Sequence, residues 1–164
     1  TGTDEVRVFV ALRKFGSSTG MVAEIGASSL TGTGRFYLAA PEDGSEHYSA
    51  LSRGTAEAVL TLRASTSAAW LAAPHSALLR MHSRISSNIT SLLLSGTQYA
   101  QATGTQGGGN YANETINIGA RNAASPSLFF AGRIASLAII GGPMTAEQIA
   151  VAEALCGADL TFSP

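Results

Sequence analysis

The chain has 164 residues, of which 45% are hydrophobic and 13% are charged, and its ten basic and eleven acidic residues give a net charge of -1. That length suits one domain with a sizeable core, and a charge so close to zero argues against nucleic acid and anionic lipid as partners. No apolar run approaches the roughly 20 residues of a membrane-spanning helix, and a single cysteine, Cys156, excludes an internal disulfide and cysteine-based metal ligation.

The first half of the chain has the pattern of short β-strands. Residues 6–12 alternate between valines or leucine on one side and arginine, phenylalanine or alanine on the other. Further strand-like runs follow at 21–28, 35–40, 47–54 and 55–65, separated by clusters of Gly, Ser, Thr, Pro and Asp that favour turns. This succession predicts an antiparallel meander.

The next segment, "SALLRMHSRIS" at 76–86, predicts another strand with a polar face and an apolar face. The apolar face carries Leu79, Met81 and Ile85, and the polar face carries Arg80, His82 and Arg84. Residues 90–102 predict a strand pair or a bent strand, interrupted at Ser95-Gly96, which favours a tight turn. The stretch 103–113 contains three consecutive glycines, which cost much ordering entropy, so we expect a flexible loop without regular structure.

The last third predicts two more strands and then a helix. The strands cover 114–121 and 128–140, and the helix covers 146–156. Thr145 and Gln148 have the spacing of a capping box, and Gly157 is placed to end the helix. The expected apolar stripe is Ile149, Ala152 or Glu153, and Leu155 or Cys156. Residues 1–164 thus predict a single all-β domain, a two-sheet antiparallel β-sandwich (jelly roll) with one short C-terminal helix.

Three motifs near the end of the chain resemble the concanavalin A-like, laminin G-like jelly-roll domains. They are Ile118-Gly119-Ala120-Arg121, then Phe130-x-Gly132-x-Ile134-x-x-Leu137-x-Ile139, then Thr145-x-x-Gln148-Ile149. "SLLLSGTQ" is similar to the family's "YVNG" hairpin, although Ser95 replaces the asparagine. The resemblance implies a binding module of bacterial surface proteins, animal extracellular proteins or phage virions. The fold alone does not choose between lectin, hydrolase and structural module.

The sequence lacks the patterns of the catalytic and metal sites that this fold can carry. No E-x-D-x-x-E strand of the related glucanases and no G-x-S-x-G elbow occurs. Two groups of side chains have oxygens that calcium could bind: Glu42, Asp43 and Glu46, and Asn110, Asn113 and Glu114. Both groups are more typical of turns. We therefore predict no catalytic residue, no metal and no cofactor.

The candidate ligand-binding residues are a row of donors and several aromatic or polar side chains. Arg80, His82 and Arg84 could donate hydrogen bonds to sugar hydroxyls or carboxylates, although antiparallel sheets commonly carry polar residues on their solvent side. A sugar ring also needs an aromatic platform. Tyr99 and Tyr111 are the candidates, Tyr111 being expected to be exposed beside Asn110, whereas Trp70 is more typical of a core and Tyr48 is less favoured.

The leading hypothesis is a non-catalytic, lectin-like module that attaches a phage virion or bacterial surface protein to glycans or cell-surface polysaccharide. Its weak sites would gain avidity in a homo-oligomer such as a trimer. The alternative is a structural domain of a virion, such as a tail, fibre or head-decoration protein, that contacts other virion proteins and no ligand; a glycoside hydrolase is less favoured. The start at Thr1 and the scarcity of lysine, with Lys14 alone, favour a piece of a longer bacterial or phage protein at an extracellular or virion surface.

Overall fold

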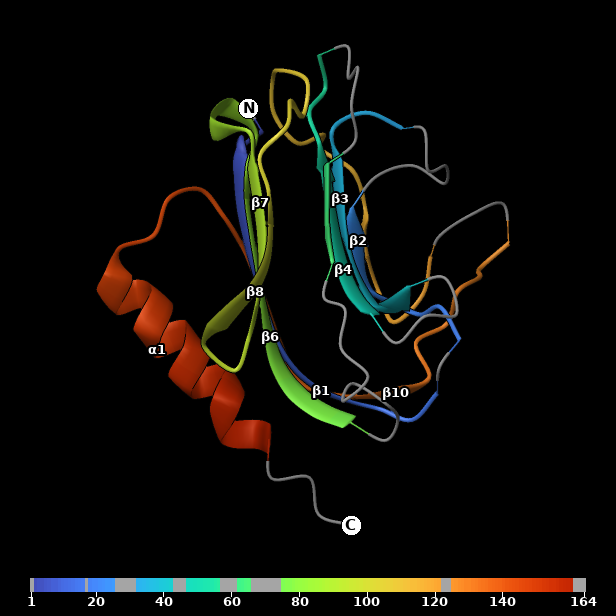
Figure 1. Cartoon of the computed structure of the whole chain (residues 1–164). Helices are drawn as coiled ribbons and strands as arrows, with labels where there is room; N and C mark the ends of the chain where they lie inside the picture. The colour runs from blue at the N-terminus through green and yellow to red at the C-terminus, as the bar shows by residue number, and fades with distance from the viewer. Residues whose placement is uncertain are drawn as a thin grey trace.

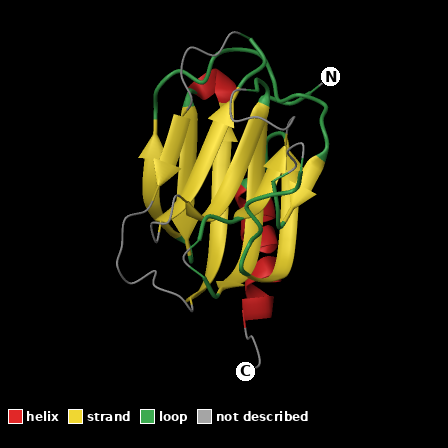
Figure 2. Ribbon diagram, turned by 90° about the vertical axis from the view of Figure 1, so that its right-hand side faces the viewer, coloured by secondary structure: helices red, strands yellow, loops and turns green. Residues whose placement is uncertain are grey.

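The computed structural model describes residues 2–16, 18–25, 32–42, 47–56, 62–65, 75–121 and 125–160. Within these ranges the chain forms two five-stranded antiparallel sheets, which stack face to face with one helix outside the first sheet (Figure 1). Viewed from the side of the second sheet, the helix lies behind the strands (Figure 2). The predicted fold class, an antiparallel β-sandwich with one C-terminal helix, is confirmed.

Sheet A has the strand order β10-β1-β6-β7-β8, and sheet B has the order β5-β4-β3-β2-β9. Sheet A comprises β1 (Glu5–Lys14), β6 (His75–Arg84), β7 (Ile89–Leu94), β8 (Thr97–Ala102) and β10 (Gly132–Gly141). Sheet B comprises β2 (Met21–Ile25), β3 (Arg35–Glu42), β4 (His47–Arg53), β5 (Leu62–Ser65) and β9 (Ile116–Ile118). The helix α1 covers Ala146–Gly157, and 3-10 turns cover Ile85–Ser87 and Ala158–Leu160.

The core lies between the sheets and is built from alternate residues of each strand. Val8 and Val10 of β1 pack there with Leu79 of β6, and Phe36 and Leu38 of β3 face them from sheet B. All five side chains are at most 2% exposed. Because strand side chains alternate, the intervening residues point to the opposite side of each sheet. Each sheet therefore has an outer face that the core does not use.

The hairpin between β7 and β8 turns at the predicted dipeptide. Ser95 and Gly96 both have positive φ, 49° and 82°. Such angles at both central residues belong to the tight turn whose twist matches that of the flanking strands. The predicted turn at Ser95-Gly96 is confirmed.

Helix α1 begins with the predicted capping box and packs against the outer face of sheet A. The Thr145 side chain accepts from the Gln148 backbone at 3.2 Å, and the Gln148 side chain accepts from the Thr145 backbone at 2.9 Å. Cys156 is the buried residue of the helix, whereas Leu155 is 69% exposed. The prediction that Gly157 ends the helix is wrong by one residue, because Gly157 is helical and Ala158 caps it in a right-handed conformation that leads into a 3-10 turn.

The glycine-rich segment predicted at 103–113 has no regular structure, and this irregular stretch extends to residue 115. It lies across one end of the sandwich (Figure 1), where its backbone bonds to Thr3, Gly34 and Gly54. Gln106 is fully buried and anchors the segment by donating to the backbone oxygens of Arg84 and Ile89 at 3.1 and 3.0 Å. A side chain on Gly54 would meet the Gly108 oxygen at 2.1 Å, so the loop lies directly on the end of β4. The glycines thus allow close backbone contact.

Several predicted features fall outside the described residues. Trp70, Asp43 and Glu46 are among them, and so is most of the predicted strand at 55–65 apart from β5. The remaining predicted strands all correspond to strands of the structure, with shifts of a few residues at their ends.

Candidate functional site

The predicted row on β6 lies on the outer face of sheet A, as the alternation indicated, and acidic side chains accompany it. Arg80 Nη1 donates to Glu153 of α1 at 2.6 Å. His82 Nε2 lies 3.1 Å from a carboxylate oxygen of Glu5 on β1. Arg84 is half exposed, and its Nε lies 3.8 Å from carboxylate oxygens of both Asp4 and Glu5. The cationic groups of this face are therefore balanced by intramolecular carboxylates.

The surroundings of His82 disfavour the protonated form of its imidazole. Burial lowers the pKa of its imidazole from the ordinary value of 6.5, and the positive charge of Arg7 lowers it further. The hydrogen bond with Glu5 acts in the opposite direction but does not outweigh these effects, because Glu5 also pairs with Arg7. Burial and Arg7 thus disfavour protonation of the His82 ring on this face.

The expectation that Tyr111 is exposed is wrong. Its side chain is only 5% exposed, and its hydroxyl lies 2.5 Å from the Ser52 hydroxyl inside the sandwich. Its ring also meets Phe36 edge to face, with centroids 5.6 Å apart. The loop turns this large apolar ring inward because burial removes its surface from water while Ser52 satisfies the hydroxyl. Tyr111 therefore forms part of the core.

The other predicted residues do not join the β6 row. Asn110 is exposed in the closing loop, where its backbone donates to Thr55 Oγ1 at 3.2 Å. Tyr99 belongs to β8 of sheet A, separated from β6 by β7, and its side chain lies outside the described part of the structure. The predicted residues are thus distributed over one sheet face, one loop and the core.

The outer face of sheet B holds a cluster that sequence patterns did not single out. Glu24 of β2 accepts from Arg35 Nη2 of β3 at 2.8 Å and from Arg121 Nε at 3.2 and 3.1 Å. The guanidinium of Arg121 lies 5.5 Å from the centroid of the Tyr37 ring. Strand alternation explains the arrangement, because Phe36 and Leu38 point into the core while Arg35 and Tyr37 point the other way.

The chain buries this cluster under the segment that follows β9. Arg121 and Ser127 exchange backbone hydrogen bonds, and Leu128 packs on the small apolar group of Met21, Tyr37, Ala39 and Leu51. Glu24, Arg35 and Arg121 are consequently 3%, 0% and 7% exposed. We call these three residues the arginine cluster.

Among the described residues, the two guanidinium groups of the arginine cluster share a single carboxylate, so these three side chains together carry one net positive charge. Nε and Nη1 of Arg35 have no hydrogen-bond partner among the described residues. Burial lowers the pKa of Arg35, with Glu24 opposing this effect and the charge of Arg121 adding to it. A buried charge is stable when it is paired. The cluster is therefore electrostatically suited to a second anion.

A hollow of about 270 Å³ opens beside the cluster, on the side of β9. It is lined by Ile116, Asn117, Ile118, Ala120, Arg121 and Pro126. The side-chain nitrogen of Asn117 is buried and has no hydrogen-bond partner in the described ranges. Asn117 lies opposite Glu24 in the β2–β9 register, so its amide and the Arg121 guanidinium belong to the same outer face. Asn117 and Arg121, which both carry N–H donors, thus line the hollow together with the exposed Ile116 and Ile118.

The described residues contain no group of three or more His, Cys, Asp or Glu side chains that could hold a metal ion. No helix in the same ranges has the length and apolar character of a membrane span. Among these residues the arginine cluster and its hollow are the arrangement that most plainly fits recognition of an anion.

No protein-family model and no curated protein matches this chain. Solved structures do. The CBM40 of the Ruminococcus gnavus IT-sialidase, bound to α2,3-sialyllactose, has a TM-score of 0.67 at 12% identity, covering 92% of this chain and 83% of that one. The heptameric SAP-like pentraxin of Limulus polyphemus also has a TM-score of 0.67 at 12% identity, covering 94% and 70%.

Domains LG4-5 of the mouse laminin α1 chain have a TM-score of 0.62 at 13% identity, covering 84% of this chain and 35% of that one. Identities this low establish a shared fold and leave function open. The resemblance at the level of fold is confirmed: the chain has the β-sandwich of CBM40, pentraxin and laminin G-like domains.

Proposed function

We propose that this chain is a non-catalytic carbohydrate-binding module that recognises an acidic sugar at the hollow beside Arg121. The observation that carries the proposal is the unbalanced charge of the arginine cluster, two buried guanidinium groups on one carboxylate. A sugar carboxylate entering the hollow would supply the missing negative charge. Arginine binds carboxylates through parallel N–H donors, which adds geometric selectivity to the attraction.

Sialylated glycans are the ligand class that we favour. A sialic acid presents a carboxylate together with hydroxyl and amide groups. The hollow is lined by Arg121, by Asn117, whose buried amide nitrogen has no partner among the described residues, and by the apolar Ile116 and Ile118. The CBM40 with the same fold, solved with α2,3- and α2,6-sialyllactose, supports this choice. A shallow site of this size suits weak binding that several copies would strengthen.

Binding to matched sugars tests the proposal. We expect purified protein to bind 3′-sialyllactose and 6′-sialyllactose in isothermal titration or NMR titration, and not lactose, which has no carboxylate. The Arg121→Ala variant should lose about tenfold or more in affinity. Arg133→Ala, which removes an exposed arginine of β10, is the matched control and should bind as the parent does. Equal binding of lactose, or unchanged affinity in Arg121→Ala, would reject the proposal.

We further propose that the module acts at a bacterial or virion surface, which agrees with the ligand class. The predicted site at Arg80, His82 and Arg84 is an alternative position for the sugar, and the same titration tests it. Loss of sialyllactose binding in Arg80→Ala, with Arg121→Ala unaffected, would move the site to the outer face of sheet A.

A second candidate function, assembly, is favoured by an exposed apolar groove. The groove, of about 450 Å³, lies between α1 and β10, and Val151 and Leu155 beside it are 53% and 69% exposed. An apolar patch of this kind is common at protein contacts. If a second copy covers it, light scattering will show an oligomer that Leu155→Glu converts to monomer; a monomeric parent would remove this candidate.

A further inference from the structure

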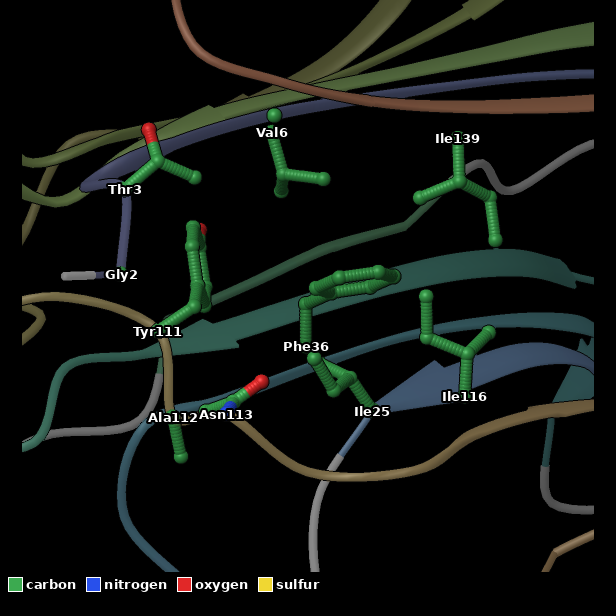
Figure 3. Close-up of a pocket in the computed structure, with 11 residues that line it drawn as sticks. Gly2, Thr3, Val6, Ile25, Phe36, Tyr111, Ala112, Asn113, Ile116 and Ile139 are labelled. Carbon is green, nitrogen blue, oxygen red and sulfur yellow. The ribbon is translucent and has the colours of Figure 1, made fainter.

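A third pocket lies between the two sheets, on the side where β9 and β10 form their edges. Its apolar walls are Val6 and Ile139 from sheet A and Ile25, Phe36 and Ile116 from sheet B, and its volume is about 350 Å³ (Figure 3). In this view the two groups of side chains face each other across the gap. We call this space the seam pocket.

Two features of the sequence leave the seam pocket unfilled. β9 has only three residues, so sheet B ends early on this side. Gly141 lies opposite Val6 in the β1–β10 register, so β10 contributes no side chain at that point. Protein interiors are otherwise packed about as densely as organic crystals. A pocket of this size in an apolar seam is therefore the space for an additional group.

Three polar side chains lie at one end of the pocket, and two of them already have hydrogen-bond partners within the protein. The hydroxyl of Tyr111 pairs with Ser52 at 2.5 Å, and that of Thr3 bonds to the backbone of Glu5 at 3.1 Å. Asn113 is exposed, and Figure 3 shows its amide beside Tyr111 at this end. Among the described residues, those that line the pocket carry no charged side chain.

The dimensions of the pocket decide between occupants. Stacked sheets lie about 10 Å apart, and side chains occupy part of that distance. The remaining gap can hold a thin group but is too narrow for a helix, whose diameter with side chains is about 10–12 Å. The described lining residues carry no charge, which disfavours an ionised ligand because its burial would be costly. A volume of about 350 Å³ is within the range of small-molecule pockets.

We propose that the seam pocket binds an uncharged apolar group of a small molecule, with any polar substituent directed outward past Asn113. The walls are held in place without the ligand, because Phe36 packs edge to face on Tyr111 and Val6 is almost fully buried. Ile116 lines both the seam pocket and the hollow beside Arg121, so the two sites lie on either side of β9. Their ligands differ in chemistry, and neither proposal depends on the other.

Fluorescence of N-phenyl-1-naphthylamine, an uncharged apolar probe, tests the inference. We expect saturable enhancement with one probe per chain. Ile116→Arg places a charge at the mouth, and Ile139→Phe fills the interior, so each should weaken probe binding about tenfold. Leu155→Arg adds the same charge in the α1 groove, at a position 69% exposed, and should leave probe affinity unchanged.

Circular dichroism first establishes that each variant retains the β-sandwich. Ile116→Arg adds a charge and Ile139→Phe adds volume, so misfolding of one variant still leaves the other to test the pocket. Absence of saturable binding to the parent protein overturns the inference. So does equal binding by the parent and both pocket variants, or loss in Leu155→Arg alone, since each would place the probe elsewhere. Sialyllactose binding is measured separately and reports on the hollow beside Arg121. A failure of the seam-pocket proposal can therefore be distinguished from a failure of the proposed function.

Discussion

The outer faces of the two sheets both carry arginines, but the arginines differ in their exposure to solvent and in the number of carboxylates that pair with them. On sheet A, Arg80 reaches Glu153 and Arg84 lies near Asp4, with each pair partly exposed to solvent. On sheet B, Arg35 and Arg121 share Glu24, and all three are almost fully buried. On the first face the Arg80 and Arg84 pairs are partly exposed, and the buried Arg7 beside them is paired with Glu5. On the second face, among the described residues, two buried guanidinium groups share one carboxylate.

This difference teaches that the number of arginines on a face is a poor guide to a binding site. Partly exposed pairs are screened by water and contribute little to stability or to attraction of a ligand. Buried charges cannot be screened in this way, so an uncompensated one acts strongly on whatever enters beside it. The site is therefore expected where charge is buried and unmatched.

The largest expected effect is that of removing the shared carboxylate. Glu24→Ala leaves the guanidinium groups of Arg35 and Arg121 buried without an anion, and we expect a loss of about 3–5 kcal/mol of unfolding free energy. Urea unfolding measures it. A loss below about 1 kcal/mol, the range of exposed ion pairs, would mean that water reaches the cluster and that the contrast between the faces is false.

A smaller effect is expected at the helix that covers sheet A. Thr145→Ala removes the side chain that accepts from the Gln148 backbone, and we expect a loss of about 1 kcal/mol in thermal or urea unfolding. Thr145→Ser keeps the acceptor and serves as the control. Equal losses in the two variants would show that the capping box does not support this face.

The pH dependence of stability distinguishes the faces further. The pKa of His82 is lowered in the folded protein, chiefly by burial, so the unfolded chain binds the proton more readily. Stability is then full above pH 6.5, the ordinary pKa, and falls as the pH drops toward the folded pKa. We expect His82→Gln to flatten this slope. Burial also lowers the pKa of His75, so part of the slope should remain; an unchanged slope would contradict the assignment to His82.

The smallest expected effect is that of Glu153→Ala, which breaks the pair with Arg80. Both side chains are about one quarter exposed, at 26% and 21%, so we expect a loss of at most about 1 kcal/mol in the same urea assay as Glu24→Ala. A loss as large as that of Glu24→Ala would make the two faces equivalent.

The fold could be predicted from sequence because its signals are local. Alternation in residues 6–12 and 79–85 assigned the inward faces, Ser95-Gly96 marked a hairpin, and Thr145 with Gln148 marked the start of α1. Each of these depends on residues a few positions apart. The end of the helix was misplaced because Gly157 permits a left-handed stop but does not require one.

The arginine cluster could not be predicted in the same way, because its members are far apart in sequence. Glu24 and Arg121 are separated by 97 residues and meet through the β2–β9 pairing and the segment beyond it. The sequence marked 35–40 as a strand-like run but singled out neither Arg35 nor its partner. Tyr111 was misjudged for a related reason, since its contacts with Ser52 and Phe36 arise from β3 and β4.

NMR of the arginine side-chain Nε–Hε groups during titration with 3′-sialyllactose tests the central claim most directly. Unmatched buried charge at the arginine cluster predicts that the Arg121 signal shifts saturably while the signals of Arg80 and Arg84 stay in place, and that lactose causes no shift. Shifts confined to Arg80 and Arg84, or no saturable shift at any arginine, would contradict it.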